Sequence, residues 1–174
     1  MRFAGSADLI GTYRNLTITG ATTWSLTAED TIARFVRESG LDIPEYDAYC
    51  YGYPEMADEI LAALLRGDKR ATTGLHCLYE IENEPLPRAG QYSVILDSRG
   101  NPHCITRITK IAITPFRDIS EEYAFIEGEG DKSLTWWKNA HREVFSRECR
   151  EDAGIEFHED MECVCEYFEV VYQK

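Results

Sequence analysis

Hydrophobic positions between residues 54 and 66 recur every three or four residues, which is the spacing of one buried helix face. Gly67 follows at the place of a left-handed helix C-cap. From Ala71 onward, β-branched, aromatic and apolar residues predict a strand. Lys69 and Arg70 therefore lie on a short connection between two rigid elements. On local pattern alone, a turn with solvated basic side chains is the simpler interpretation, but such a loop can also aim an amine at a substrate.

A second helix is expected from Thr27 to about Gly40. Thr27 is a suitable N-cap, and apolar residues share one face of the segment that follows it. Residues 1–23 are rich in Gly and Thr, with only a short strand suggested at 16–18. We interpret residues 1–23 as an N-terminal extension that is flexible or was introduced by cloning, and residues 24–174 as one domain.

The segment from residue 41 to 53 contains four tyrosines among Asp, Pro and Gly residues: Tyr46, Tyr49, Tyr51 and Tyr53. This composition predicts an irregular aromatic segment before a helix opened by Pro54. Tyrosine rings can stack on a base, but tyrosines in a loop more often pack beneath it and hydrogen-bond its backbone. We include Tyr51 and Tyr53 among the residues expected to contact a ligand.

Two strand patterns, at 92–96 and 103–113, flank a turn that contains Arg-Gly-Asn and predicts a hairpin. Alternation returns at 161–172, where a last strand is expected to close the sheet. Successive strands without an intervening helix favour an antiparallel sheet or a small barrel over parallel βαβ units.

The segment 118–131 is strongly acidic, but its aromatic and apolar residues must turn inward, and its glycines allow the backbone to curl. A helix from about 132 to 149 follows, with an apolar face that includes Trp137. His141 lies one turn after Trp137. A His on a mostly apolar face is more often a hydrogen-bonded core residue than a catalyst.

The chain has 174 residues and is 44% hydrophobic, which suits one globular domain with its own core. The sequence shows no membrane-spanning run and no leader pattern, so we expect a cytoplasmic protein. The six cysteines form no C-x-x-C pair and are expected to be free thiols. A metal site stays open as the less favoured alternative, at His76-Cys77, at His103-Cys104 or at the cluster of His158, Cys163 and Cys165.

The formal net charge is −13, which works against binding to a nucleic-acid backbone. The charge is unevenly distributed, because residues 66–110 hold seven Lys or Arg against five acids. The least acidic segment therefore surrounds Lys69, which fits a small polar or anionic ligand better than a long duplex.

Three sequence features together resemble the ASCH domain family. The first is Gly67-x-Lys69 followed by Thr72, and the second is the Pro-x-x-Gly turn at 87–90 that leads to a strand. The third is the segment 124–134, with Glu127-Gly128-x-Gly130-Asp131-x-Ser133, ahead of a Trp-bearing helix with His141. The resemblance extends over about residues 27–174.

This resemblance implies an α+β fold, namely a PUA-like small antiparallel or mixed β-barrel flanked by helices, with a cleft between the Gly-x-Lys loop and the Glu-bearing segment. Family members are regarded as RNA-binding or RNA-related, and some resemble amidohydrolases that act on acetylated cytidine. The catalytic roles of those members would correspond to Lys69, Thr72 and Glu127. Those members carry an Arg where this chain has Gly74. The remaining residues expected to contact a ligand are Arg70, Thr73, Ser133 and His141.

Three functions remain open on this basis. The first is hydrolysis of an acylated nucleoside, for which Lys69 would have to be partly neutral and Glu127 protonated in an apolar pocket. The second is a module that binds single-stranded RNA or a base without chemistry. The third is RNA cleavage that needs no metal. We expect no cofactor and no metal, a small nucleoside, nucleotide or single-stranded RNA as the partner, and no membrane partner. The oligomeric state stays open, with a dimer as one alternative.

Overall fold

The computed structural model describes residues 23–174 and divides them into two compact units. Unit 1 contains the described residues up to Leu65, together with 91–107 and 170–174. Unit 2 contains residues 66–90 and 108–169. The proposed extension at residues 1–23 lies outside the described residues except for its last member. No helix in the described part of the chain is long and apolar enough to cross a membrane.

Unit 1 is built from helices and strands around a small aromatic and aliphatic core. Its helices are α1 (Thr23–Ser39) and α2 (Pro54–Arg66, whose last residue belongs to unit 2), and its strands are β1 (Tyr46–Tyr49), β3 (Tyr92–Leu96) and the first part of β4 (Pro102–Pro115). β1 pairs with β3 in parallel, and β3 pairs with β4 antiparallel. One cluster of buried residues in this unit consists of Phe35, Val36, Val94 and Ile105.

The hairpin expected between the strands at 92–96 and 103–113 is confirmed, because β3 pairs antiparallel with β4. The carboxylate of Asp97 accepts hydrogen bonds from the backbone N–H groups of Arg99 and Asn101, at 2.9 and 2.8 Å. These bonds satisfy turn donors that would otherwise need water. The helix opened by Pro54 is also confirmed.

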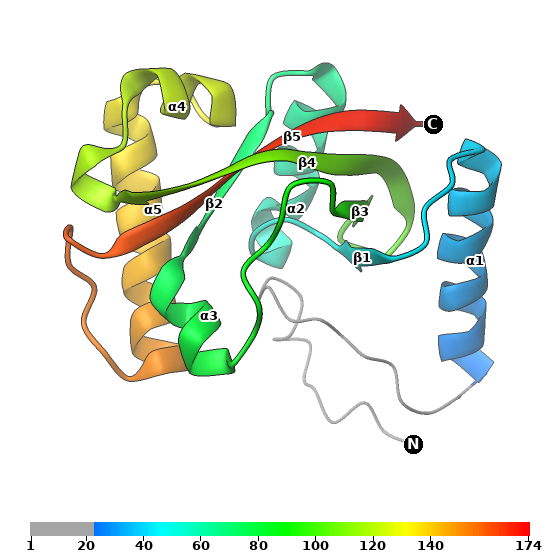
Figure 1. Ribbon diagram of the computed structural model, residues 1–174, viewed down its shortest axis with the longest axis horizontal. Helices are drawn as coiled ribbons and strands as arrows, with labels where there is room; N and C mark the ends of the chain where they lie inside the picture. Colours follow the sequence, from blue (N-terminus) through cyan, green and yellow to red (C-terminus); the bar gives the residue numbers. More distant parts are fainter. Residues whose placement is uncertain (1–22) are drawn as a thin grey trace. The chain divides into compact units, whose positions relative to one another are not determined.

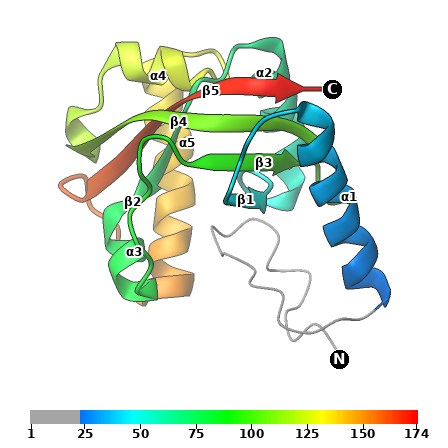
Figure 2. The same cartoon turned by 45° about the vertical axis from the view of Figure 1, so that its right-hand side comes forward.

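Unit 2 holds the larger core. Its elements are β2 (Ala71–Leu75), α3 (His76–Glu82), the second part of β4, the 3-10 turn η2 (Phe116–Asp118), α4 (Glu121–Glu127), α5 (Leu134–Glu148), the π-helical turn η3 (Cys149–Ala153) and most of β5 (Glu162–Gln173). Figures 1 and 2 show α5 running along one face of these strands, with α4 at its N-terminal end and α3 beside its C-terminal end. Phe116, Trp137 and Phe145 are fully buried between the helices and the sheet.

The five strands are hydrogen-bonded in the order β1-β3-β4-β5-β2. The predicted α+β fold with a mixed sheet and flanking helices is therefore confirmed. Within residues 23–174 the sheet is not closed into a barrel, because β1 and β2 stand at the two ends of the order. The last strand does not close the sheet either, since β5 lies between β4 and β2 and pairs antiparallel with β2.

Several elements differ from the sequence predictions. The expected strand from Ala71 ends at Leu75, and α3 follows directly. The acidic segment contains a helix, α4, whose N-cap is the hydroxyl of Ser120. Thr27 is not an N-cap, because α1 begins at Thr23. The segment 46–49 is a strand and not an irregular loop, because it pairs with β3.

Candidate functional site

The loop that carries Lys69 is fixed by its own backbone. Gly67 ends the preceding helix with φ of 89°, as expected for a left-handed C-cap. The backbone N–H of Arg70 donates to the carbonyl of Ile126 at 2.9 Å, and the N–H of Phe168 donates to the carbonyl of Arg70 at 3.0 Å. The Arg70 guanidinium donates to the carbonyl of Lys69 at 2.7 Å. Arg70 therefore holds the loop in place.

Alternation along β2 decides which side chains face the helices. Ala71 and Leu75 lie in the core formed with α4 and α5, so Thr73 shares their face. Thr72 and Gly74 lie on the opposite face. Thr72 pairs across the sheet with Glu166, a buried residue of β5. Thr73 therefore faces the helices, and Thr72 lies on the other face of the sheet.

Glu127, the last residue of α4, is the centre of a buried hydrogen-bond network. Its Oε2 accepts from Thr73 Oγ1 at 2.8 Å and from Trp137 Nε1 at 2.5 Å. Its Oε1 lies 3.5 Å from Lys69 Nζ and 3.4 Å from His141 Nε2. The predicted proximity of Lys69 and Glu127 is thus observed, although they are 58 positions apart. The hydroxyl that bonds Glu127 belongs to Thr73 and not to Thr72.

A second carboxylate, which was not among the predicted site residues, also binds Lys69. Glu129 Oε1 lies 2.5 Å from Lys69 Nζ. The Lys69 side chain is only 1% exposed. Its ammonium group lies between the carboxylates of Glu127 and Glu129. The signal that could have identified Glu129 is the repeat Glu127-Gly128-Glu129-Gly130, in which both acids lie in one tight segment.

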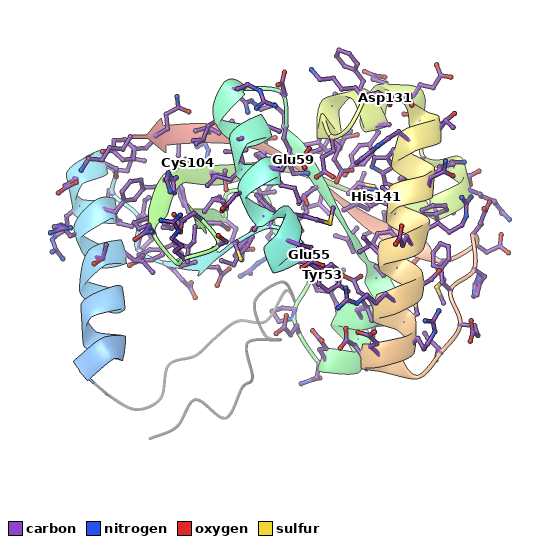
Figure 3. All side chains as sticks on the ribbon, turned by 180° about the vertical axis from the view of Figure 1, so that it is seen from behind. Tyr53, Glu55, Glu59, Cys104, Asp131 and His141 are labelled. Atoms are coloured by element: carbon purple, nitrogen blue, oxygen red, sulfur yellow. The ribbon has the colours of Figure 1, made fainter. Side chains whose placement is uncertain are left out.

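His141 lies one helical turn after Trp137 on α5, and Figure 3 shows it about midway along that helix. Its ring stacks on the Trp137 indole, with centroids 4.0 Å apart and planes 16° apart. Its Nδ1 lies 3.1 Å from the carbonyl oxygen of Trp137. With Nε2 near Glu127, both ring nitrogens have partners. His141 is therefore buried, hydrogen-bonded and part of the site.

The charges in this network reinforce one another. Burial disfavours the ammonium form of Lys69, but the carboxylates of Glu129 and Glu127 more than offset it and raise its pKa above the ordinary value. Burial likewise disfavours ionised Glu127, yet the charges of Lys69 and His141 and the hydrogen bonds from His141 and Trp137 lower its pKa. Burial opposes the charged form of His141, but Glu127 raises its pKa. The resting site therefore holds an ammonium ion beside carboxylates.

These charge states correct one expectation. Hydrolysis was expected to need a partly neutral Lys69 beside a protonated Glu127 in an apolar pocket. The structure opposes this because Glu127 is surrounded by donors, and its neighbour Phe125 is 62% exposed and supplies no apolar wall.

The other expected ligand-binding residues have structural contacts. The hydroxyl of Ser133 is the N-cap of α5 and accepts from the N–H of Trp136 at 3.1 Å. Tyr51 is buried in unit 1 and packs edge-on against Tyr49. Tyr53 belongs to unit 1 as well, and its carbonyl accepts from the backbone N–H of Ala57 at 3.0 Å. A ligand-binding role for these residues stays a prediction.

Two aromatic residues of the site were not expected to act there. Trp137 donates its indole N–H to Glu127, and the Tyr123 hydroxyl bonds both Thr73 Oγ1, at 2.9 Å, and the carbonyl oxygen of Thr72, at 2.8 Å. The sequence pattern marked Trp137 as a core residue, which it also is. Nothing in the spacing of an apolar face shows that its polar atom meets a carboxylate.

The described residues contain no group of three or more His, Cys, Asp or Glu side chains that could hold a metal ion. The six cysteines are free thiols, four of them buried. Burial raises the pKa of Cys165 to about 11 and that of Cys149 to about 11. These thiols act as small apolar core residues at neutral pH.

Comparison with known proteins identifies the family. The ASCH domain model matches residues 47–172. A crystal structure of an ASCH domain from Lactobacillus crispatus JV V101 is 38% identical, covers 91% of this chain and 100% of its own, and superimposes with a TM-score of 0.74. A crystal structure of a protein from Enterococcus faecalis V583 is 34% identical, covers 83% of this chain and 88% of its own, and has a TM-score of 0.73. No match was found among curated proteins. The chain therefore belongs to the ASCH domain family.

Proposed function

We propose that the protein is a hydrolase that removes an acyl group from a modified nucleoside at the site of Lys69 and Glu127. The observation that carries this proposal is a lysine with 1% exposure, held between Glu127 and Glu129 in a network that also contains His141. A buried charge is costly unless it is paired, and such clusters are more common at functional sites than elsewhere. The resemblance to ASCH members that act on acetylated cytidine supplies the substrate class.

The charge states suggest how the reaction would proceed. As the acyl oxygen takes up the charge of the Lys69 ammonium, Glu127 accepts a proton from water, and the resulting hydroxide attacks the acyl carbonyl carbon. The Lys69 ammonium stabilises the negative charge that develops on the carbonyl oxygen. The C–N bond then breaks, and the proton held by Glu127 passes to the departing amine nitrogen. The products are a carboxylic acid and the free amino nucleoside.

This scheme differs from the resemblance in the role of the threonines. The resemblance implies that Thr72 acts in catalysis, whereas the hydrogen bond from Thr73 to Glu127 favours Thr73 as the residue that orients the carboxylate. We propose water as the nucleophile. The role of Thr72 stays a prediction that the variants below can test.

The charge of unit 2 favours a small substrate over a long RNA. Unit 2 has eleven Lys or Arg residues against twenty Asp or Glu residues. A polyanion would be repelled by such a surface, because RNA affinity depends on accumulated basic contacts. A neutral acylated nucleoside has no such penalty.

The test is turnover of N-acylated nucleosides, with N-acetylcytidine first, measured by chromatographic separation of substrate and product. We expect Lys69→Ala and Glu127→Gln each to lower kcat by at least about a hundredfold, because each removes a charge placed for the transition state. Lys110→Ala is the matched control, since Lys110 is exposed and its Nζ lies over the ring of Tyr167, 4.8 Å from the ring centroid. We expect Thr73→Val to lower kcat more than Thr72→Val.

The result that would overturn the proposal is absence of turnover by the folded wild-type protein across the acyl nucleoside series. Saturable binding of a labelled single-stranded RNA by such an inactive protein would instead support a binding module. Cleavage of that RNA in the presence of a chelator would support a metal-independent ribonuclease.

A further inference from the structure

The two carboxylates that pair with Lys69 are held very differently. Glu127 is 1% exposed and contacts four donors, from Lys69, Thr73, Trp137 and His141. Glu129 is 13% exposed. Among the residues that the structure describes, Lys69 is the one side chain that bonds Glu129. Glu127 is therefore fixed by its surroundings, whereas Glu129 depends on a single contact.

The backbone around Glu129 is anchored on both sides. Gly128 has φ of 77°, and a Cβ there would lie 2.0 Å from the carbonyl oxygen of Asp68, so the backbones touch. Lys132 Nζ pairs with Asp68 Oδ1 at 2.9 Å. The backbone N–H of Lys132 also donates to the carbonyl of Glu129 at 2.9 Å. Glu129 can consequently leave Lys69 by rotation about its own side-chain bonds, without displacement of the loop.

We propose that Glu129 occupies, in the unliganded protein, the position at Lys69 Nζ that an oxygen atom of the ligand takes in the complex. Glu129 is then a displaceable partner of Lys69, and Glu127 is the permanent one. The site would select ligands that offer an oxygen with full or partial negative charge to the ammonium group. This inference rests on the proposed function, in which that oxygen belongs to the substrate's acyl group.

The exchange has a physical advantage. A buried ammonium with only one weakly placed carboxylate, at 3.5 Å, would be poorly compensated while the site is empty. Glu129 supplies the second negative group until the substrate arrives. When the carboxylate moves into water, the ammonium faces an oxygen whose charge grows in the transition state, which is the condition for differential stabilisation.

The first experiment measures the reactivity of the Lys69 amine and needs no turnover. The intact protein is reductively methylated with formaldehyde, and the modification rate of Lys69 is read from peptide mass spectrometry. We expect Lys69 to be methylated about tenfold faster in Glu129→Gln than in the wild type, because loss of the nearer carboxylate lowers the pKa of the amine and so raises its unprotonated fraction. Glu122→Gln, which changes an exposed acid on α4, should leave the rate unchanged.

The second arm tests whether an external anion can replace Glu129. In Glu129→Ala, sodium acetate should slow Lys69 methylation toward the wild-type rate, whereas sodium chloride at equal ionic strength should not. The proposal is overturned if Lys69 is methylated no faster in Glu129→Gln and Glu129→Ala than in the wild type, or if acetate does not slow its methylation in Glu129→Ala. A shared melting temperature for the variants establishes that the comparison is between folded proteins.

Kinetics with the acylated nucleoside separate exchange from permanent positioning. Exchange predicts a lower KM for Glu129→Gln with kcat largely retained, because the substrate no longer competes with an internal carboxylate. A permanent positioning role predicts a lower kcat at an unchanged KM, and that result would contradict the proposal. If the wild type shows no turnover at all, the proposed function fails, while the methylation arms still decide whether Lys69 exchanges its partner.

Discussion

At the scale of single residues, Lys69 is the unusual feature of this chain, because a lysine is almost never fully buried unless it is paired. Its two carboxylate partners keep it charged, and the same arrangement keeps Glu127 ionised. In the proposed reaction, the Lys69 ammonium would stabilise a developing negative charge. An unprotonated lysine acting as a base would need a different environment.

A separate acidic residue makes a pH-dependent prediction. Glu148 ends α5 and is only 8% exposed; burial first, and then the nearby charge of Asp152, raise its pKa from 4.5 to about 7. The folded state therefore binds more protons between pH 4.5 and 7, so this contribution to stability is full below that window and is lost as the pH rises through it. The expected loss is about 3 kcal/mol.

Urea unfolding of the wild type and Glu148→Gln at pH 5 and pH 8 measures this effect. We expect the wild type to lose more stability on going to pH 8 than Glu148→Gln does. Glu143→Gln on the exposed side of α5 is the control and should behave like the wild type. Equal pH dependence of the wild type and Glu148→Gln would show that Glu148 has an ordinary environment.

Residue identities in the site were only partly predictable. The spacing of Gly67, Lys69 and the distant Glu127 was recognisable as a set, and those two charged groups do meet. Thr72 and Thr73 could not be distinguished, because the choice depends on which face of β2 the helices cover. Glu129 was overlooked because an acid in an acidic run is ordinarily solvated.

At the scale of elements, the site depends on how the α4–α5 connection packs against the Lys69 loop. Gly128 is the point of closest approach, since its missing side chain leaves room for the carbonyl of Asp68. Gly154 is a useful comparison, because it is also a helix C-cap with positive φ, 65°, but a Cβ there would meet nothing within 4 Å.

We expect Gly128→Ala to destabilise the protein by about 2 kcal/mol or more beyond Gly154→Ala. Both substitutions place Ala at positive φ, which costs about 1–2 kcal/mol, but only the first forces two backbones apart. Chemical denaturation gives both values. Similar losses for the two variants would mean that the contact between Gly128 and Asp68 is not tight.

The elements themselves were predicted unevenly, for identifiable reasons. The periodic pattern of α2, α5 and the β3–β4 hairpin agrees with long-range packing, so these elements were found. α3 was interpreted as strand because its Cys, Leu and Tyr residues suit a strand. In the structure this segment is helical and packs against β2 and the π-helical turn η3. α4 was not predicted, because an acidic segment is ordinarily interpreted as a solvated face.

At the scale of the whole molecule, charge and fold point to different partners. The ASCH fold is associated with RNA, whereas the net charge of −13 works against a phosphate backbone. The proposed nucleoside substrate would reconcile the two, because it carries the bases of RNA without its phosphate charge. The open mixed sheet could not be distinguished from a barrel in sequence, because closure depends on strand order, which alternation along one strand does not encode.

The most direct test of the central claim is a crystal structure of the wild-type protein with a non-hydrolysable N-acyl cytidine analogue. We expect the acyl oxygen, or the atom that replaces it, at about 3 Å from Lys69 Nζ, with the Glu129 carboxylate displaced and Glu127 still bonded to Thr73 and Trp137. An analogue bound elsewhere, with the contact between Lys69 and Glu129 intact, would contradict the account.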